Sequence, residues 1–154
     1  MVKKDNIWFL CRFYCDNSKG YSDKQSSENV FKILEKSHIP LAHLIREEYD
    51  KRAGILFGQI YKSVLFSRFY IMFASLRLRI FIIRTSNKFK KEIALLTKFV
   101  SLCDDNLRVQ TLYIGVTLSR CKKYMKGLFI RQKIDESIPQ ILNFLNRYFS
   151  APSD

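Results

Sequence analysis

The chain has 154 residues, of which 47% are hydrophobic, and its formal net charge is +13 at pH 7. This length fits one globular domain with a hydrophobic core, and thirteen Phe and eight Tyr exclude a disordered chain, which would be poor in aromatics. Five Gly and three Pro are too few for an all-β fold with many tight turns.

The excess positive charge lies in the last two thirds of the chain. Residues 1–50 contain eight basic and eight acidic residues, whereas residues 51–154 contain nineteen basic and six acidic residues. The tracts 53–91 and 106–134 contain eight and seven basic residues, respectively, and no acid. Tracts of one sign repel themselves unless an anionic partner, or solvent on separate faces, relieves the repulsion. They favour a polyanionic partner, with a basic surface that has no partner as the alternative.

In chain order, the first apolar segment, residues 6–14, fits either a strand or a helix. Residues 15–27 are polar and rich in turn-forming residues, which predicts a mobile loop. An amphipathic helix is expected at residues 27–37, with Ser26 or Ser27 at its start. Pro40 suits the first turn of a second helix that extends to Arg52.

Residues 53–84 form the longest apolar stretch of the sequence. Apolar residues recur here every three or four positions, which favours a long helix that ends near Ser75 or continues to Arg84. Residues 76–80 alternate with period two, so a strand at residues 76–84 remains an alternative. A transmembrane span is not expected, because Arg68, Arg77 and Arg79 would each cost roughly 2.5–3.5 kcal/mol inside the bilayer.

Three further helices are predicted after this stretch. The spacing of Phe89, Ile93, Leu96, Val100 and Cys103 indicates a helix. Residues 104–106 are suited to cap the next helix, which continues to about residue 128. A last helix is expected at residues 137–149, followed by a frayed tail at 150–154. The sequence therefore predicts an all-α fold, a single-domain bundle of five or six helices over residues 1–154, with an α+β fold as the alternative.

The basic residues suggest two binding clusters. The first consists of Arg77, Arg79, Arg84, Lys88, Lys90 and Lys91. The second consists of Arg120, Lys122, Lys123, Lys126, Arg131 and Lys133. Arginine forks and lysine ammonium groups complement phosphate oxygens. A continuous helix would align part of the first cluster in one stripe, and a strand would place Arg77 and Arg79 on one face.

These clusters predict a protein that binds nucleic acid, DNA or RNA, through its phosphate backbone. No RNP, zinc-finger or helix-turn-helix signature is present, so readout of base sequence is not expected. Tyr70, Tyr113 and Tyr124 are candidate stacking surfaces. The alternatives are an assembly subunit that docks onto an acidic protein, with homo-oligomerisation possible, and a peripheral binder of anionic membranes.

No enzymatic activity, cofactor or metal is expected. The sequence lacks H-E-x-x-H, G-x-G-x-x-G, P-loop and G-x-S-x-G motifs. His38 and His43 would diverge by about 140° on a helix and cannot share a ligand face. The four cysteines, Cys11, Cys15, Cys103 and Cys121, are expected to be reduced and mostly buried, because no zinc spacing or signal peptide is present. We therefore predict an intracellular protein, cytoplasmic or nuclear.

Overall fold

The computed structural model describes residues 5–15, 32, 34, 40–102 and 107–131. Within them the core element is a curled, five-stranded antiparallel sheet with the strand order β2-β3-β1-β5-β4. The strands are β1 (Asn6–Cys15), β2 (Tyr70–Ser75), β3 (Ile80–Ser86), β4 (Ser101–Leu102) and β5 (Leu107–Gly115).

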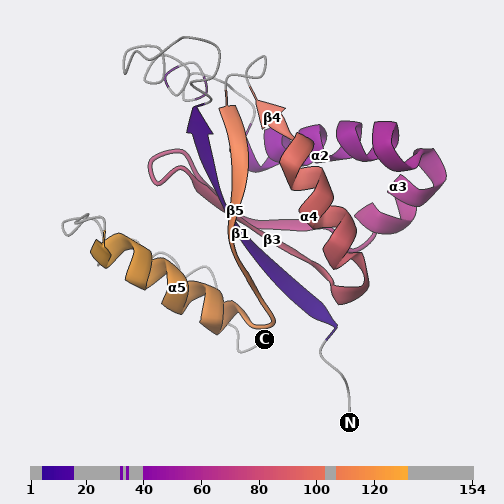
Figure 1. Ribbon diagram of the computed structural model, residues 1–154. Coiled ribbons are helices and arrows are strands. Elements are labelled where there is room, and N and C mark those ends of the chain that lie inside the picture. The colour runs from indigo at the N-terminus through magenta and orange to yellow at the C-terminus, as the bar shows by residue number, and fades with distance from the viewer. Residues whose placement is uncertain (1–4, 16–31, 33, 35–39, 103–106, 132–154) are drawn as a thin grey trace.

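Four helices are described beside this sheet. They are α2 (Leu41–Phe57), α3 (Gln59–Phe66), α4 (Lys90–Phe99) and α5 (Leu118–Arg131), and a short 3-10 helix, η2 (Asn87–Phe89), precedes α4. Figure 1 shows α2, α3 and α4 on one side of the sheet and α5 on the other side. No described helix is long and apolar enough to cross a membrane.

The prediction of an all-α bundle is wrong, because the most apolar segments are strands buried on both faces. Along β1, Ile7, Phe9 and Phe13 belong to the core beneath α2 and α4, whereas Trp8 and Leu10 belong to the core beneath α5. A strand covered on both faces has no polar side and therefore no period of two. Segment 6–14, which fitted strand or helix equally, is the central strand.

The long helix predicted from residue 53 onward is also wrong. α2 ends at Phe57, and Gly58 then adopts a φ of +84°, which other residues rarely adopt and which ends the helix. α3 and β2 follow. The alternative strand at residues 76–84 had different bounds from the real ones, because residues 76–79 form the turn between β2 and β3.

The helix predicted from residue 107 to residue 128 divides into two elements. β5 occupies residues 107–115, where Leu107 and Val109 are buried and the residue after each of them, Arg108 and Gln110, is more exposed. This period of two was present in the sequence, but the three-and-four spacing around Ile114 hid it. Only the second half, from Leu118, is helical, and its apolar residues Leu118, Cys121 and Met125 are buried.

Two predicted helices are confirmed. The helix expected at residues 40–52 is α2, which continues to Phe57, and the helix expected around residues 89–103 is α4, which ends at Phe99. The helix at 27–37, apart from Lys32 and Leu34, the loop after Cys15, the helix at 137–149 and the tail at 150–154 lie outside the described residues.

Candidate nucleic-acid interface

Arg77 and Arg79 lie in the turn between β2 and β3, where both side chains are exposed. The backbone N–H of Arg79 donates to the carbonyl oxygen of Leu76 at 3.2 Å, and the carbonyl oxygen of Arg79 accepts from the N–H of Phe13 at 2.8 Å. Arg79 has a φ of +59°, a left-handed conformation that costs a residue with a Cβ roughly 1–2 kcal/mol. The turn therefore presents two guanidinium groups from a backbone that is tied to β1.

Arg84 lies near the opposite end of β3 and is half-buried between two aromatic rings. Its Cζ is 4.8 Å from the centroid of the Tyr70 ring and 5.8 Å from that of Trp8. Register explains this arrangement, because β3 is flanked by β2 and β1 and Arg84 pairs with Tyr70 on one side and Trp8 on the other. The guanidinium group is therefore oriented by cation–π contacts, and the Tyr70 side of the stack is 44% exposed.

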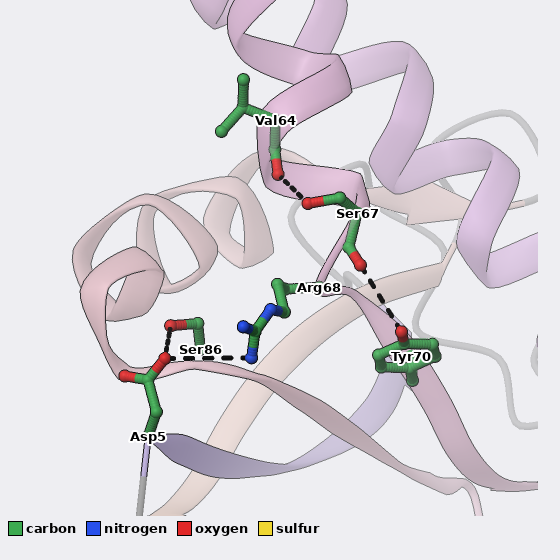
Figure 2. Close-up of polar contacts among 6 residues, drawn as sticks. All are labelled: Asp5, Val64, Ser67, Arg68, Tyr70 and Ser86. Atoms are coloured by element: carbon green, nitrogen blue, oxygen red, sulfur yellow. Dashed lines mark hydrogen bonds and ion pairs between the residues drawn. The ribbon is translucent and has the colours of Figure 1, made fainter. Parts of the chain in front are cut away.

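Figure 2 shows the polar contacts that hold this end of the sheet. The hydroxyl of Tyr70 donates to the carbonyl oxygen of Ser67 at 3.4 Å, and the Ser67 hydroxyl donates to a carbonyl oxygen of α3 at 2.6 Å. Beside them, Asp5 Oδ2 accepts a hydrogen bond from the Ser86 hydroxyl at 2.7 Å and lies 3.9 Å from Nη1 of Arg68. These contacts fix the edge of the phenol ring while leaving part of its face exposed.

The structure separates Lys88, Lys90 and Lys91 from the arginines of the same predicted cluster. Lys88 is in η2, with its Nζ 5.2 Å from the centroid of the Phe89 ring, and Lys90 and Lys91 begin α4. All three are exposed, but they belong to the side of the sheet that carries α2, α3 and α4. The stripe expected from one continuous helix is therefore absent.

The second predicted cluster lies on α5. Arg120, Lys123 and Lys126 are exposed, Lys122 is half-buried, the Arg131 side chain is not described, and Lys133 lies outside the described residues. The inner side of α5 is joined to the sheet near Arg84, because the Cys121 thiol lies 4.0 Å from the carbonyl oxygen of Trp8.

Helix geometry places two of the α5 lysines on the flank away from β5. Tyr124 stacks on Tyr113 of β5, with ring centroids 5.0 Å apart and an interplanar angle of 11°. Lys122 and Lys126 each lie two residues from Tyr124 along the helix, or about 160° around its axis. They therefore lie on the β3 side of α5, whereas Tyr113 and Tyr124 are half-buried against each other and less suited to stack on bases than Tyr70.

Acidic residues are distributed unequally between the two sides of the sheet. Among the described residues, Glu47, Glu48 and Asp50 are on α2, Glu92 is on α4, and the remaining acid, Asp5, sits at the end of β1 beside Arg68. The part of α5 that is described carries basic residues and no acid. Among the described residues, cations therefore lie on both sides of the sheet, but α5 has no acid to offset its cations.

Arg12 is a surface cation that was not among the predicted site residues, because it lies in the electrically neutral third of the chain. Arg12 is exposed between the buried residues Cys11 and Phe13, and its Nε donates to Oε1 of Gln110 on β5 at 2.8 Å. A charged residue between two buried ones is a signal of a strand edge or face open to solvent, and it was available in the sequence.

The cysteines behave as structural residues where they are described. Cys11 and Cys121 are buried, as predicted, and Cys15 is half-buried. Burial raises the pKa of the Cys11 thiol to about 12, so this thiol stays protonated and unreactive near neutral pH. Within the described residues, no three His, Cys, Asp or Glu side chains are grouped so that they could hold a metal ion.

No protein-family model and no curated protein sequence matches this chain. In fold, it is similar to one chain of the cryo-EM structure of yeast ribonuclease MRP, with a TM-score of 0.53 and 10% sequence identity. The match covers 88% of this chain and 96% of that chain. The likeness therefore extends over nearly the whole of both chains and concerns their fold.

Proposed function

We propose that the chain is an RNA-binding subunit of an RNA–protein assembly and that it binds the phosphate backbone without enzymatic activity of its own. The observation that carries this proposal is the segregation of charge, which leaves cations and no acid on the described part of α5. We define the basic α5 surface as the exposed cations of α5, Arg120, Lys123 and Lys126, together with Tyr70 and Arg84 on the same side of the sheet.

The basic α5 surface combines the two elements that single-stranded nucleic acid requires. Its lysines and arginines supply positive potential for phosphates, and Tyr70 supplies an aromatic face for a base. Arg84 is already oriented by Tyr70 and Trp8, so less side-chain entropy is lost when it binds. The fold likeness to a chain of yeast ribonuclease MRP, an enzyme named for its action on RNA, favours RNA over DNA and a role inside the cell.

The test is an anisotropy titration of fluorescent single-stranded RNA with two matched triple variants. Replacement of Arg120, Lys123 and Lys126 by Glu should weaken binding at least tenfold, because it reverses three charges on the proposed surface. Replacement of Lys88, Lys90 and Lys91 by Glu changes the net charge equally on the other side and should have a much smaller effect.

The control variant is expected to fold, since acidic residues at the start of α4 interact favourably with the helix dipole. For the wild type, the logarithm of the association constant should fall with the logarithm of salt concentration by about 0.7 per phosphate contact. Equal losses in both triple variants would show that net charge, rather than the basic α5 surface, determines binding. Absence of binding at low salt would overturn the proposal.

A second candidate function is docking onto a protein within such an assembly. The corner between α2 and α3 exposes Ile55, Ile60 and Val64, and Ile60 is 87% exposed. Exposed apolar groups gathered in one place are typical of interfaces. If this corner mediates self-association, sedimentation velocity should show larger species at high concentration for the wild type and fewer for Ile60→Asp.

A further inference from the structure

Along most of its length, the outer edge of β5 is not paired with any strand of the described residues. β4 pairs with β5 only at Ser101–Arg108 and Leu102–Leu107. Beyond that point, no described strand pairs with residues 109–115 on the side away from β1. In an antiparallel strand, the N–H and C=O groups that are not bonded to one neighbour point toward the other side, so this edge presents backbone groups that can pair with an added strand.

A cavity of about 690 Å³ runs along this edge. Ala94, Thr97 and Lys98 of α4 form one wall, and Val109 and Ile114 of β5 continue it on the same side of the sheet. Arg12 also lines the cavity, although its bond to Gln110 places it on the opposite face of the sheet from Val109. A cavity that touches both faces must pass around the edge of β5, which leaves room for a chain beside it.

The groove is lined by basic and apolar side chains. Arg12 and Lys98 are exposed, and none of the lining residues is acidic. Two large apolar side chains beside it are also exposed, namely Leu95 next to Ala94, at 41%, and Val116 directly after β5, at 51%. The face toward Arg12 therefore favours acidic side chains, whereas the face toward α4 presents apolar groups together with the cation Lys98.

We propose that the open edge of β5 binds an extended segment of a partner protein, which adds to the sheet as a strand with alternating acidic and apolar side chains. Residues 109–115 span at most about 23 Å at roughly 3.3 Å per residue, and the strand bulges between Thr111 and Tyr113, where its register with β1 shifts. Strand addition of this kind takes affinity from main-chain hydrogen bonds and specificity from alternate side chains.

A second copy of this chain fits the groove poorly. Pairing of two β5 edges would add the positive charge of one groove, from Arg12 and Lys98, to that of an identical groove, and no acid lines either groove to offset it. The groove is also distinct from the basic α5 surface, so this proposal stands or fails independently of RNA binding.

The probe is an acetylated heptapeptide of alternating Val and Glu, titrated into the full-length protein and followed by amide hydrogen exchange. In the free protein, the amides of residues 109–115 that do not bond to β1 should exchange quickly, and the peptide should slow them. Two further peptides carry N-methyl groups on the backbone nitrogens of either the Val residues or the Glu residues. Their affinities for the protein should differ at least tenfold. Only one set of peptide N–H groups faces β5, whereas the side chains are the same in both.

Charge exchange provides the matched control. The double variant Arg12→Glu with Lys98→Glu should bind the Val/Glu peptide at least tenfold more weakly than the wild type does, and it should bind a Val/Lys peptide more tightly. Its affinity for RNA should stay close to that of the wild type. Equal affinity of both N-methylated peptides, or no binding at all, would overturn the proposal. So would protection of the same amides by RNA alone, or by a concentration-dependent dimer of the free protein.

Discussion

Arg84 and Tyr70 face each other across the β2–β3 pair, with the guanidinium carbon 4.8 Å from the centroid of the phenol ring. The contact joins a cation that can reach a phosphate to an aromatic face that can stack on a base. Substitution of Arg84 by lysine can separate the effect of charge from the effect of orientation, because lysine keeps the positive charge but lacks the planar group that lies over the ring.

Substitutions of Arg84 should therefore distinguish orientation from charge. Arg84→Lys should weaken RNA binding about two- to fivefold, because the lysine is not held over the ring and ordering its side chain on binding costs about 0.5–1 kcal/mol, and it should leave the salt slope unchanged. Arg84→Gln should in addition lower the slope by about 0.7, because one phosphate contact to the single-stranded RNA is lost. Wild-type affinity and slope in both variants, measured by anisotropy across a salt series, would exclude Arg84 from the interface.

A buried hydrogen bond between Tyr49 and Thr97 joins α2 to α4 beneath the sheet. The two hydroxyl oxygens are 2.7 Å apart, and the Thr97 hydroxyl donates to the carbonyl oxygen of Ile93 at 2.8 Å. Tyr49 is therefore the donor to Thr97. Urea unfolding should show that Tyr49→Phe costs about 1 kcal/mol, whereas Thr97→Val, which leaves a buried phenol without its acceptor, costs about 1–3 kcal/mol.

The double variant of these two residues should be less destabilised than the sum of the single variants. Removing both hydroxyl groups leaves no buried donor without a partner, so the two changes interact. Additive losses in the double-mutant cycle would show that the two hydroxyl groups are not coupled in solution.

The buried thiol of Cys11 should make stability fall at alkaline pH. Burial raises its pKa from 9.0 to about 12, so the folded state keeps a proton that the unfolded state has lost. The resulting stabilisation is complete below pH 9 and is lost as the pH rises toward 12. Between pH 8.5 and 10.5, urea unfolding should show that the wild type loses on the order of 2 kcal/mol more than Cys11→Ala. Parallel curves for the two proteins would contradict a buried protonated thiol.

The conformation of Arg79 predicts a difference between two neutral substitutions. Its φ of +59° is open to glycine but disfavoured for a residue with a Cβ. Arg79→Gly should therefore be about 1 kcal/mol more stable than Arg79→Ala in thermal unfolding, although both lose the same guanidinium group. Equal stability would show that the turn relaxes out of the left-handed conformation when the arginine is removed.

The fold was partly predictable from local patterns. α2 and α4 followed from a helix-starting proline and from apolar residues three and four apart, because each of these helices buries only one side. The strands β2 and β5 were not predicted, since they lie in apolar stretches in which helical spacings can be found by chance, and β3 was only overlapped by the alternative strand at residues 76–84. In residues 107–110 the alternation was visible, and a longer helical pattern outweighed it.

The candidate site was predictable in its chemistry more than in its geometry. The basic residues were found in the sequence, but the expected stripe joined Arg84 to Lys88 and Lys91, which the structure places on the other side of the sheet. Tyr70 was one of three candidate stacking residues, and the structure distinguishes it by pairing Tyr113 with Tyr124. Whether these residues bind nucleic acid is the subject of the titrations above.

The sequence by itself determined that this chain has a hydrophobic core and a strongly basic C-terminal two thirds, because composition and charge do not depend on how the chain folds. Only the tertiary structure decided which cations share a surface. Trp8, Tyr70 and Arg84 come from distant segments and meet through strand register, which depends on hydrogen bonds between strands and on burial of both sheet faces. Neither of these is encoded in the spacing of residues along one segment.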